Sequence, residues 1–479
     1  MLLTKSDYMI GLQCPKYLWI KKNQPETLPQ NSMATQHRFD QGHLIGQFAQ
    51  KLFASGKLVQ GNFSENIEKT KQFIEQKQTI FEAGILAGDL YSRADILEPE
   101  WNIYEVKSST SVKEEHILDV AFQKYVYEKA GLNIQKCFLI HINNQYVKQG
   151  EIKPNELFIK ADITEEVSKE LPNVEPNISR IFKFLALKNP PEFQLIYIEN
   201  SFYGNPVIDE FMDSLPDENV FQLYRGGKKC TELFGKKICK LIEIPDDYRL
   251  TAHQQIQKQC AKTGKPHINK EKLSEFIGSL KYPLCFLDFE TFNTALPLFD
   301  GTKPYQQIPF QYSLHIVDKE TRHLSFLAEG KQDPRKNFLQ SLKSNLGSEG
   351  SIIVYNQSFE IGRLKELAEI FPEEQDWINS VIARIVDLII PFRKFYYYNP
   401  KQKGSASIKD VLPAMTGKSY DELEITNGED AGIMFLAITF GDVEDEKVRN
   451  NLLEYCKLDT EGMIWILDEL KKVTNLINN

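Results

Sequence analysis

Alternating hydrophobic and polar positions in the first half of the chain predict a small β-meander. The alternation runs through residues 84–97, and a Glu-Pro-Glu turn separates it from a second run over 102–107. Period-two alternation bounded by turn residues is typical of antiparallel strands with one buried face. Upstream, apolar residues at helical spacing predict a helix over 6–19, capped by Ser6, and another over about 36–53.

The second half of the chain is organised around an apolar run of strand length over 284–291. Nearly continuous hydrophobicity over that length is typical of a buried central strand. The elements predicted after it are strands over 310–317 and 323–327, a helix over 333–346, a strand over 351–356, a helix capped by Ser358 and a long final helix containing Tyr455 and Asp459. The two halves together predict a fold of the α/β (α+β) class.

The length of the chain predicts more than one domain, because 479 residues exceed the size of an ordinary single domain. We expect an N-terminal domain over 1–198, a connector over 199–278 and a C-terminal domain over 279–479. The connector lacks strong periodicity, apart from a possible short strand over 241–245. We interpret it as a hinge or bridge rather than a third catalytic domain.

The composition is that of a soluble globular protein. Hydrophobic residues make up 42% and charged residues 26% of the chain, and no apolar run approaches the ~20 residues of a membrane span. The first residues lack the apolar core of a signal peptide. Seven cysteines without a Cys-x-x-Cys pair indicate neither a disulfide framework nor a zinc knuckle. We therefore expect a cytoplasmic protein with no membrane partner.

The net charge of −9 argues against a general nucleic-acid coat, which would need a basic field. It is compatible with a nuclease, because metal-binding acids make such a site negative while local basic patches contact phosphate. Arg225 belongs to one candidate patch, whose alternative interpretation is a solvated loop face. The other members are Lys228, Lys229, Lys236, Lys237 and Lys240.

Two acids and a lysine form the first candidate site. Asp95 lies on one predicted strand, and Glu105 and Lys107 are two residues apart on the next, so these two share a face. Two carboxylates can hold Mg²⁺ or Mn²⁺, and an adjacent ammonium group can orient or activate an attacking water. On the helix that follows, Gln123 and Tyr127 share a face because they are four residues apart.

This ordered set resembles the PD-(D/E)XK nuclease fold in its RecB-like form. The resemblance implies that the two acids are metal ligands and that Lys107 is the catalytic lysine. It also implies that Gln123 and Tyr127 brace the site and contact nucleic acid. His43 stands where that branch often supplies an additional metal ligand.

Cys14 raises the question of an iron–sulfur cluster. In iron–sulfur members of this branch, a cysteine in a similar setting pairs with three more placed after the nuclease core. The matching region, 199–212, contains no cysteine, and the later cysteines have a different spacing. Because a cluster needs four thiolates within reach, no iron–sulfur cluster is expected.

A second set of acids begins on the predicted central strand. Asp288 and Glu290 are two residues apart and share one face, where buried carboxylates require neutralisation by a cation. The alternative is a strand that merely ends in solvated acids. Glu360 lies in the first turn of a helix close to the end of a strand. Tyr455 and Asp459 share one face of the final helix.

The order of these residues resembles the DEDDy 3′→5′ exonucleases of the ribonuclease H-like fold, over about the last 200 residues. By this resemblance the four acids bind metal and Tyr455 positions the attacking water. Glu360 departs from the wider pattern, which has Asp, and the extra methylene can change the metal spacing. Two Mg²⁺ ions about 3.5–4 Å apart would clamp the attacking and leaving oxygens of a phosphodiester.

Both sets together resemble a bacterial family of unknown function that joins the two domains, with landmarks at 12–16, 105–109 and 288–291. The resemblance implies a metal-dependent nuclease that uses Mg²⁺ or Mn²⁺ and acts on nucleic acid, with DNA favoured over RNA. One alternative is a nucleic-acid-binding protein with one or both centres inactive. Another is a ribonuclease H-like domain with different phosphoryl chemistry, for instance on a nucleotide.

Overall fold

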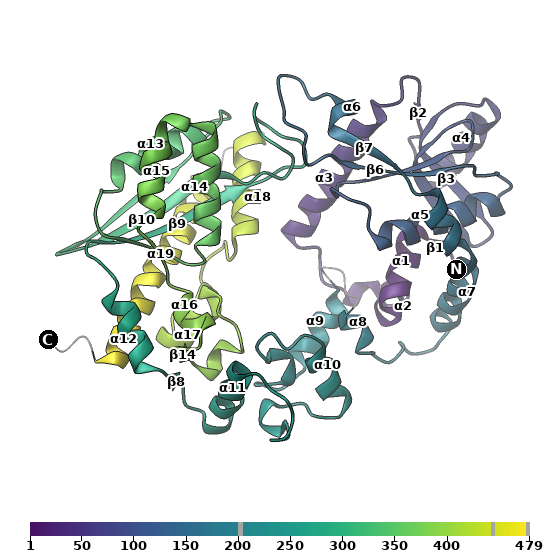
Figure 1. The fold of residues 1–479 in the computed structure, drawn as a ribbon. Coiled ribbons are helices and arrows are strands. Elements are labelled where there is room, and N and C mark those ends of the chain that lie inside the picture. Colours follow the sequence, from purple (N-terminus) through teal and green to yellow (C-terminus); the bar gives the residue numbers. More distant parts are fainter. Residues whose placement is uncertain (200–204, 442–445, 476–479) are drawn as a thin grey trace. The chain divides into compact units, whose positions relative to one another are not determined.

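The protein folds into two compact units (Figure 1). The computed structural model describes residues 1–199, 205–441 and 446–475. Unit 1 comprises Met1–Met212 and Thr294–Gln306, and unit 2 comprises Asp213–Asn293 and Gln307–Asn479. Helices and sheets occur in both units, which confirms the predicted α/β (α+β) class. The segment expected as a connector is divided between the two units at Met212.

Unit 1 is built on a seven-stranded mixed sheet with the order β2-β3-β4-β5-β6-β7, and β1 also pairs with β4. The predicted meander is confirmed, because β3, β4 and β5 are consecutive antiparallel neighbours. Strand β6 then pairs in parallel with β5. The strands are β1 (Leu3–Thr4), β2 (Lys57–Leu58), β3 (Ile80–Ala87), β4 (Leu90–Leu97), β5 (Ile103–Lys107), β6 (Cys137–Ile142) and β7 (Phe158–Asp162).

Helices cover both faces of this sheet. One hydrophobic core joins the strands to α5 and α7, through residues such as Phe122 and Ile181. A second core includes Ile45 of α3 and Ala295 of the Thr294–Gln306 segment. The helices are α1 (Lys5–Gln13), α2 (Pro15–Asn23), α3 (Met33–Gln50), α4 (Phe63–Glu75), α5 (Glu114–Lys129), α6 (Pro154–Leu157), α7 (Thr164–Leu185), α8 (Ile196–Glu199) and α9 (Pro206–Asp213).

The single helix predicted over 6–19 is wrong, because two helices occupy this stretch. Cys14 is extended, with φ −144° and ψ 90°, and α2 begins at Pro15. A proline disfavours helical backbone at the residue before it and lacks the N–H that would continue the helix. The cap of α1 is Thr4 rather than Ser6, since the Thr4 side chain accepts a hydrogen bond from the Asp7 backbone N–H.

Unit 2 contains a five-stranded sheet with the order β11-β10-β9-β12-β13, so β9 is the central strand as predicted. Strands β9, β12 and β13 are parallel to one another, and β10 is antiparallel to β9 and β11. The strands are β9 (Leu284–Phe292), β10 (Ile308–Val317), β11 (Thr321–Leu327), β12 (Ser351–Val354) and β13 (Ile385–Asp387), with β8 (His267–Ile268) and β14 (Tyr397–Tyr398) paired in a separate ribbon.

The two faces of β9 have different partners. Cys285, Leu287 and Phe289 join the core with α13, α14 and α15, while α18 and α19 also pack on this strand. The helices are α10 (Lys228–Gly235), α11 (Ala252–Thr263), α12 (Lys270–Gly278), α13 (Arg335–Asn345), α14 (Ser358–Ile370), α15 (Gln375–Ile382), α16 (Ile390–Arg393), α17 (Ile408–Thr416), α18 (Gly428–Phe440) and α19 (Glu446–Thr474).

Two local features of unit 2 differ from expectation. The short strand predicted over 241–245 is wrong, because Leu241–Glu243 forms a 3₁₀ helix. Helix α18 was not predicted, since its last eight residues are almost uniformly apolar and have no helical period.

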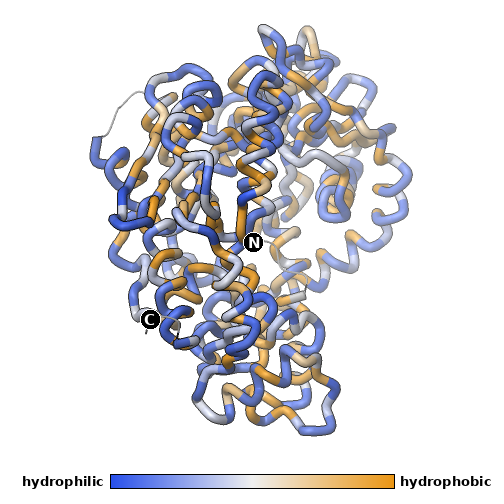
Figure 2. Tube along the Cα trace, turned by 60° about the vertical axis from the view of Figure 1, so that its left-hand side comes forward, coloured by the Kyte–Doolittle hydropathy of each residue, from blue (hydrophilic) through white to orange (hydrophobic). Residues whose placement is uncertain are grey.

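Hydrophobic and hydrophilic residues are interspersed along the chain (Figure 2). Within the described ranges, no helix combines the length and the hydrophobicity that crossing a membrane requires.

Candidate active sites

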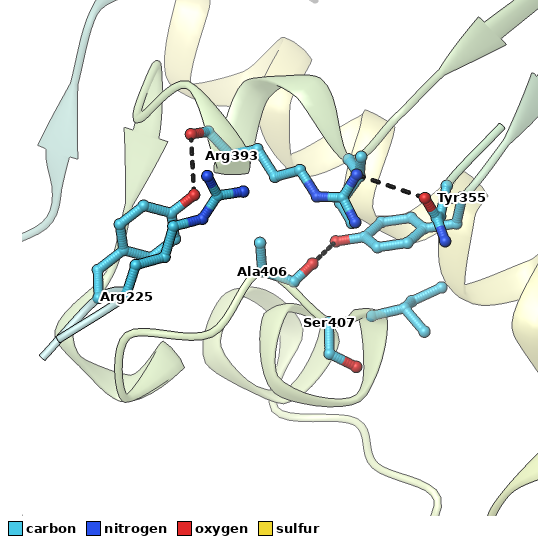
Figure 3. Close-up of a pocket in the computed structure, with 9 residues that line it drawn as sticks. Arg225, Tyr355, Arg393, Ala406 and Ser407 are labelled. Atoms are coloured by element: carbon cyan, nitrogen blue, oxygen red, sulfur yellow. Dashed lines mark hydrogen bonds between the residues drawn. The ribbon is translucent and has the colours of Figure 1, made fainter. Parts of the chain in front are cut away.

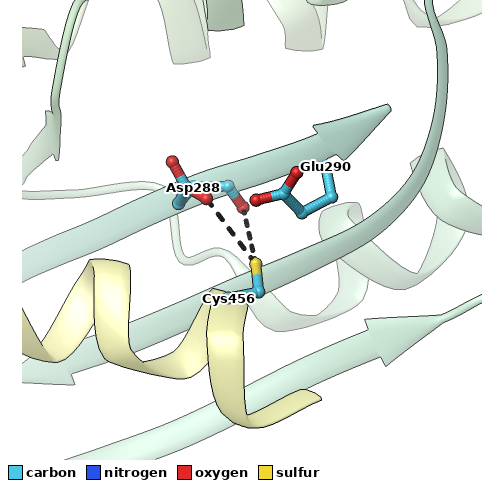
Figure 4. Close-up of side chains that lie close together, drawn as sticks. All are labelled: Asp288, Glu290 and Cys456. Carbon is cyan, nitrogen blue, oxygen red and sulfur yellow. Dashed lines mark hydrogen bonds between the residues drawn. The ribbon is translucent and has the colours of Figure 1, made fainter. Parts of the chain in front are cut away.

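Asp288 and Glu290 project from the same face of β9 toward α19 (Figure 4). One ligating atom from each of these two carboxyl groups and the Cys456 sulfur lie within 4.8 Å of one another. The Cys456 thiol donates to Oδ2 of Asp288 at 3.6 Å. The i, i+2 spacing on β9 places both acids on one face, as predicted, and this face lies against the final helix.

Buried polar contacts fix the register of α19 on the sheet. The Thr460 hydroxyl lies 2.7 Å from the Ser313 hydroxyl and 2.8 Å from Nδ1 of His315, both on β10. The Gln311 side-chain amide donates to the Leu452 carbonyl at 2.7 Å. Buried groups of this kind are costly to leave unpaired, so sliding the helix along the sheet is disfavoured.

Asp459 is the acid that α19 brings to this site. The Tyr420 hydroxyl donates to its Oδ1 at 2.6 Å. Burial raises the pKa of Asp459 to about 6, although hydrogen bonds from Tyr420 and Tyr455 act in the opposite direction. Tyr455, one turn earlier on the helix, is also buried, and burial raises its pKa well above the ordinary value. Its phenol therefore stays protonated.

Glu360 lies in the first turn of α14, where the sequence predicted it. Asp387 holds the preceding turn, because its carboxylate accepts hydrogen bonds from the backbone N–H groups of Asn356 and Gln357, at 2.9 and 3.1 Å. Glu360 is only 2% exposed, and its Oε2 has no hydrogen-bond partner. Burial raises its pKa to about 8. An orphaned buried carboxyl oxygen indicates a missing partner.

Repulsion among the acids adds to the effect of burial. The pKa values of Asp288 and Glu290 are raised well above their ordinary values, first by burial and then by the charges of Asp459 and Glu360. The positive charge of Lys409 opposes this shift by lowering the pKa values of Glu290 and Asp459. The Lys409 ammonium group donates a hydrogen bond to the Thr426 carbonyl. The positive charge of Lys409 thus offsets the repulsion at two of the four carboxyl groups.

The donor set fits a hard divalent cation such as Mg²⁺ or Mn²⁺, which prefers carboxylate oxygens. Asp288 and Glu290 would hold such a cation, and Asp459 and the orphaned Oε2 of Glu360 are the further carboxyl oxygens that could reach it. Cys456 is a hydrogen-bond donor rather than a ligand, because burial raises its pKa and a protonated thiol does not bind such a cation.

Helix α18 closes the site from the side opposite α14. A Cβ on Gly428 would lie 3.1 Å from Oε2 of Glu290, and one on Gly432 would lie 2.8 Å from the Thr291 carbonyl. At Gly432 only glycine lets the helix approach the β9 backbone so closely, whereas a side chain at Gly428 would displace the end of Glu290.

In unit 1, the structure brings Glu105, Lys107, Asp119 and Gln123 together. The Lys107 ammonium donates to Oε1 of Glu105 at 2.7 Å and to Oδ2 of Asp119 at 2.6 Å. The Gln123 amide donates to Oε2 of Glu105 at 2.7 Å. Glu105 is 2% exposed, and burial would raise its pKa, but the nearby lysines outweigh burial and lower it.

Lys5 is a member of this site that sequence reasoning missed. Its ammonium group donates to Oε1 of Glu105 at 2.8 Å and lies 3.6 Å from Asp119. Asp119 of α5 is a second member that the sequence analysis did not single out. The sequence carries no signal for the Lys5 contact, because 100 residues separate Lys5 from Glu105.

Asp95, Tyr127 and His43, the other predicted members of this set, make different contacts. Asp95 accepts a hydrogen bond from the Val106 backbone N–H at 2.7 Å, and burial raises its pKa to about 7. The Tyr127 hydroxyl donates to the Ala83 carbonyl and accepts from the Ala94 N–H, so it braces the sheet. His43 is exposed on α3, and no group of three potential metal-ligating side chains in the described ranges includes it.

Unit 1 therefore differs from unit 2 in its charge balance. Three carboxyl groups, of Asp95, Glu105 and Asp119, face the two ammonium groups of Lys5 and Lys107. Among the described atoms of these side chains, Oε1 of Gln123 is a buried acceptor without a partner. Asp95 and Glu105 fit a single divalent cation, but the two lysines already provide much of the neutralisation that a cation would give.

Cys14 is a small buried residue between α1 and α2. It packs with Tyr197 and Val207, and burial raises the pKa of its thiol. Among the described residues, no set of three ligating side chains that could share an ion contains Cys14. These surroundings do not fit an iron–sulfur cluster, which is held by thiolates.

Protein purified without oxygen is accordingly expected to be colourless and to contain no stoichiometric iron. Elemental analysis and an absorption spectrum of the anaerobic protein provide the measurement. A broad visible band accompanied by stoichiometric iron, both lost in Cys14→Ser, would contradict this expectation.

Part of the chain matches a described family. The profile of a "Domain of unknown function (DUF2779)" matches residues 285–407, which include β9 and α14. Uncharacterized protein UU173 of Ureaplasma parvum is 30% identical over 227 residues, which are 42% of this chain and 33% of that protein. Uncharacterized protein MG366 of Mycoplasma genitalium is 23% identical over 421 residues, which cover 73% of this chain and 61% of that protein. The chain thus spans less than two thirds of these relatives.

Two solved structures share low similarity with the chain. The family B DNA polymerase of the archaeon Pyrobaculum calidifontis is 18% identical, with a TM-score of 0.29, and the match covers 40% of this chain and 24% of that one. The alkaline exonuclease LHK-Exo of Laribacter hongkongensis is 10% identical, with a TM-score of 0.23, covering 38% and 89%.

Proposed function

We propose that the chain is a metal-dependent nuclease that hydrolyses nucleic-acid phosphodiesters. Its main centre is the acidic site of unit 2, formed by Asp288, Glu290, Glu360 and Asp459, and a 3′→5′ exonuclease is the activity that its resemblance to DEDDy enzymes implies. A second centre lies in unit 1, which we assign to the RecB-like PD-(D/E)XK type. DNA is the favoured substrate over RNA.

The convergence of four buried carboxyl groups in unit 2 carries this proposal. Their pKa values are all raised, and Oε2 of Glu360 has no partner. A protein gains nothing in stability from such an arrangement, because buried like charges repel and are poorly solvated. The arrangement is explained if the four groups hold divalent cations, whose Lewis acidity stabilises charge on a phosphodiester under attack.

The side chains around the acids would orient the reactants. Tyr455 keeps its proton and lies beside Asp459, so it can position an attacking water by hydrogen bonding. Tyr420 holds Oδ1 of Asp459 and so orients this carboxyl group. Lys409, which lies 5.8 Å from the Tyr455 ring centroid, can attract the negatively charged phosphodiester.

The unit 1 centre would work differently. Lys107 already contacts Glu105 and Asp119 and is partly exposed, so its ammonium group can orient a water or stabilise the leaving group's charge. Asp95 and Glu105 would hold one divalent cation there. This different use of charge suggests two distinct cleavage steps rather than a duplicated one.

Digestion of end-labelled oligonucleotides tests the proposal. Single-stranded and duplex DNA and RNA are incubated with Mg²⁺, with Mn²⁺ or with EDTA, and the products are resolved at single-nucleotide resolution. We expect cleavage that requires a divalent cation, with a ladder that shortens from the 3′ end. Binding without cleavage of any substrate would favour a nucleic-acid-binding protein with inactive centres. Turnover of free nucleotides alone would favour a ribonuclease H-like domain with different phosphoryl chemistry.

Tyr420→Phe is expected to lower metal affinity about 10- to 100-fold, because outer-shell partners of metal ligands typically have effects of this size. The hydroxyl that it removes orients Asp459 at 2.6 Å. Mn²⁺-dependent cleavage rates at increasing Mn²⁺ concentration measure the change, and saturating Mn²⁺ should restore much of the rate. Tyr455→Phe should instead lower the rate at saturating Mn²⁺. An unchanged Mn²⁺ dependence in Tyr420→Phe would contradict this assignment.

A further inference from the structure

We infer that unit 2 contains a binding site for the sugar–phosphate backbone of an unpaired nucleic-acid strand, in a hollow beside the acidic site (Figure 3). The hollow has a volume of about 450 Å³ and is formed by segments far apart in the sequence. This inference rests on the proposed function, because it names the form of substrate that the acidic site receives. The side chains that the argument uses are Tyr224, Arg225, Tyr355, Asn356, Arg393 and Ser407.

The hollow is positively charged. Arg225 and Arg393 both line it, and neither guanidinium group forms an ion pair with a carboxylate of the described residues. A second hollow of about 410 Å³ shares Tyr224 and both arginines and adds Lys394. No aspartate or glutamate lines either hollow. The two hollows share Tyr224, Arg225 and Arg393, and together they are called the groove below.

Hydrogen bonds with two buried glutamines of α11 hold the turn that carries Arg225. Gln254 and Gln257 of α11 are 2% and 1% exposed. Gln257 accepts a hydrogen bond from the Tyr224 N–H at 2.7 Å, and the Gln254 amide donates to the Tyr224 carbonyl at 2.9 Å. Arg225 has a φ of +48°, which is uncommon for a residue with a side chain. Such backbone persists only where its surroundings hold it.

The arginine on the other side is also positioned by packing. Arg393 ends α16, and the aromatic ring of Phe395 stacks on His253 at 4.6 Å between centroids. The Tyr224 hydroxyl donates to the Arg393 carbonyl at 3.4 Å, which connects the two sides. The Arg393 guanidinium reaches Oδ1 of Asn356 at 3.3 Å. Most of its donors therefore remain available to a ligand.

Phosphate groups fit these donors, because a guanidinium group can bind a phosphate through two parallel hydrogen bonds. Two arginines at the junction of two hollows can contact successive phosphates of one chain. Tyr224 and Tyr355 also line the hollow, so their side chains are within reach of the bases of a bound strand. A hollow of about 450 Å³ admits single nucleotides but not the width of a duplex.

The elements that line the hollow also carry residues of the acidic site. Asn356 comes just before α14, which bears Glu360. Ser407 caps α17, whose Lys409 lies over the rings of Tyr420 and Tyr455. A strand bound in the groove would therefore have its end close to the four acids.

Equilibrium binding without catalysis tests this inference. The full-length protein is titrated into a fluorescein-labelled single-stranded oligonucleotide in EDTA, and anisotropy is measured at several salt concentrations. We expect Arg225→Ala and Arg393→Ala each to weaken binding about tenfold. Each should also reduce the slope of log K against log salt by about 0.7, the value for one phosphate contact of a single strand. An unlabelled duplex should compete poorly.

Arg322→Ala is the matched control, since Arg322 is exposed on β11 of the same unit and lies outside both hollows. Thermal unfolding curves identify any variant that fails to fold, and Arg225→Lys should recover part of the affinity if charge is the cause. The inference is overturned if Arg225→Ala and Arg393→Ala bind like Arg322→Ala, or if the duplex competes equally well. Cleavage by the wild-type protein is measured separately, so loss of the proposed function and loss of this site give different results.

Discussion

Replacing Asp288 by asparagine is expected to abolish metal-dependent cleavage at the unit 2 centre and to stabilise the metal-free protein. The loss of activity should be on the order of 10³-fold, because a metal site supplies several kcal/mol of charge stabilisation. The gain in stability follows from removing a buried ionisable group, since burial and then the charges of Asp459 and Glu290 raise the pKa of Asp288. The substitution should increase the free energy of unfolding at pH 8 by about 1–2 kcal/mol.

Burial of the acids also sets a pH dependence. The folded-state pKa of Glu360 is about 8 and that of Asp459 about 6, both above the unfolded values near 4. The unfolded chain therefore binds fewer protons in this window, and the stability of the metal-free protein falls as the pH rises from about 4 to about 8. Urea unfolding in EDTA at several pH values measures this, and Asp288→Asn should flatten the curve.

Asp318→Asn is the control for this variant, because Asp318 is exposed between β10 and β11 and lies away from the acids. It should leave cleavage and stability unchanged. The assignment fails if well-folded Asp288→Asn protein, with the unit 1 centre disabled, still trims oligonucleotide ends at the wild-type rate.

Replacing Lys107 by alanine is expected to remove a different set of products. Lys107 contacts both Glu105 and Asp119, and its loss leaves Lys5 as their one remaining ammonium partner among the described side chains. We expect cleavage that depends on unit 1 to fall about 10²- to 10⁴-fold, the range for a group that acts on proton transfer or charge at a reacting atom. A time course on long end-labelled duplex and single-stranded DNA gives the products.

The comparison needs Asp288→Asn, the double variant and Lys71→Ala, an exposed lysine of α4, as the control. The two active-site variants should remove different bands from the same digest, and the double variant should remove both sets. If Lys107→Ala changes neither the rate nor the products on any substrate, unit 1 is a platform for binding rather than a second centre.

The sequence was informative wherever function depends on local spacing. The pair Asp288 and Glu290 shares a face because of the two-residue period of a strand, and Tyr455 and Asp459 share one because of the helical period. Each pair could be placed before the fold was known. The central position of β9 followed from its nearly continuous apolar run.

Contacts between segments that are distant in the sequence could not be predicted. Tyr420 is 39 residues from Asp459, and Lys5 is 100 residues from Glu105. No period links such residues, so only the packing of complete elements reveals them. The groove between Arg225 and Arg393 has the same origin, although Arg225 had been noticed as part of a basic patch.

The account depends most directly on a divalent cation binding to the four acids of unit 2. Titration of the protein with Mn²⁺ at pH 8, followed by the electron paramagnetic resonance signal of free Mn²⁺, measures this without substrate or turnover. Because unit 1 would also hold a cation, the titration uses protein whose unit 1 centre is disabled by Glu105→Gln. We predict stoichiometric uptake of Mn²⁺ by this protein with or without Asp318→Asn, and at least tenfold weaker uptake when Asp288→Asn or Asp459→Asn is added. Equally tight uptake with and without the two acidic-site substitutions would contradict the account.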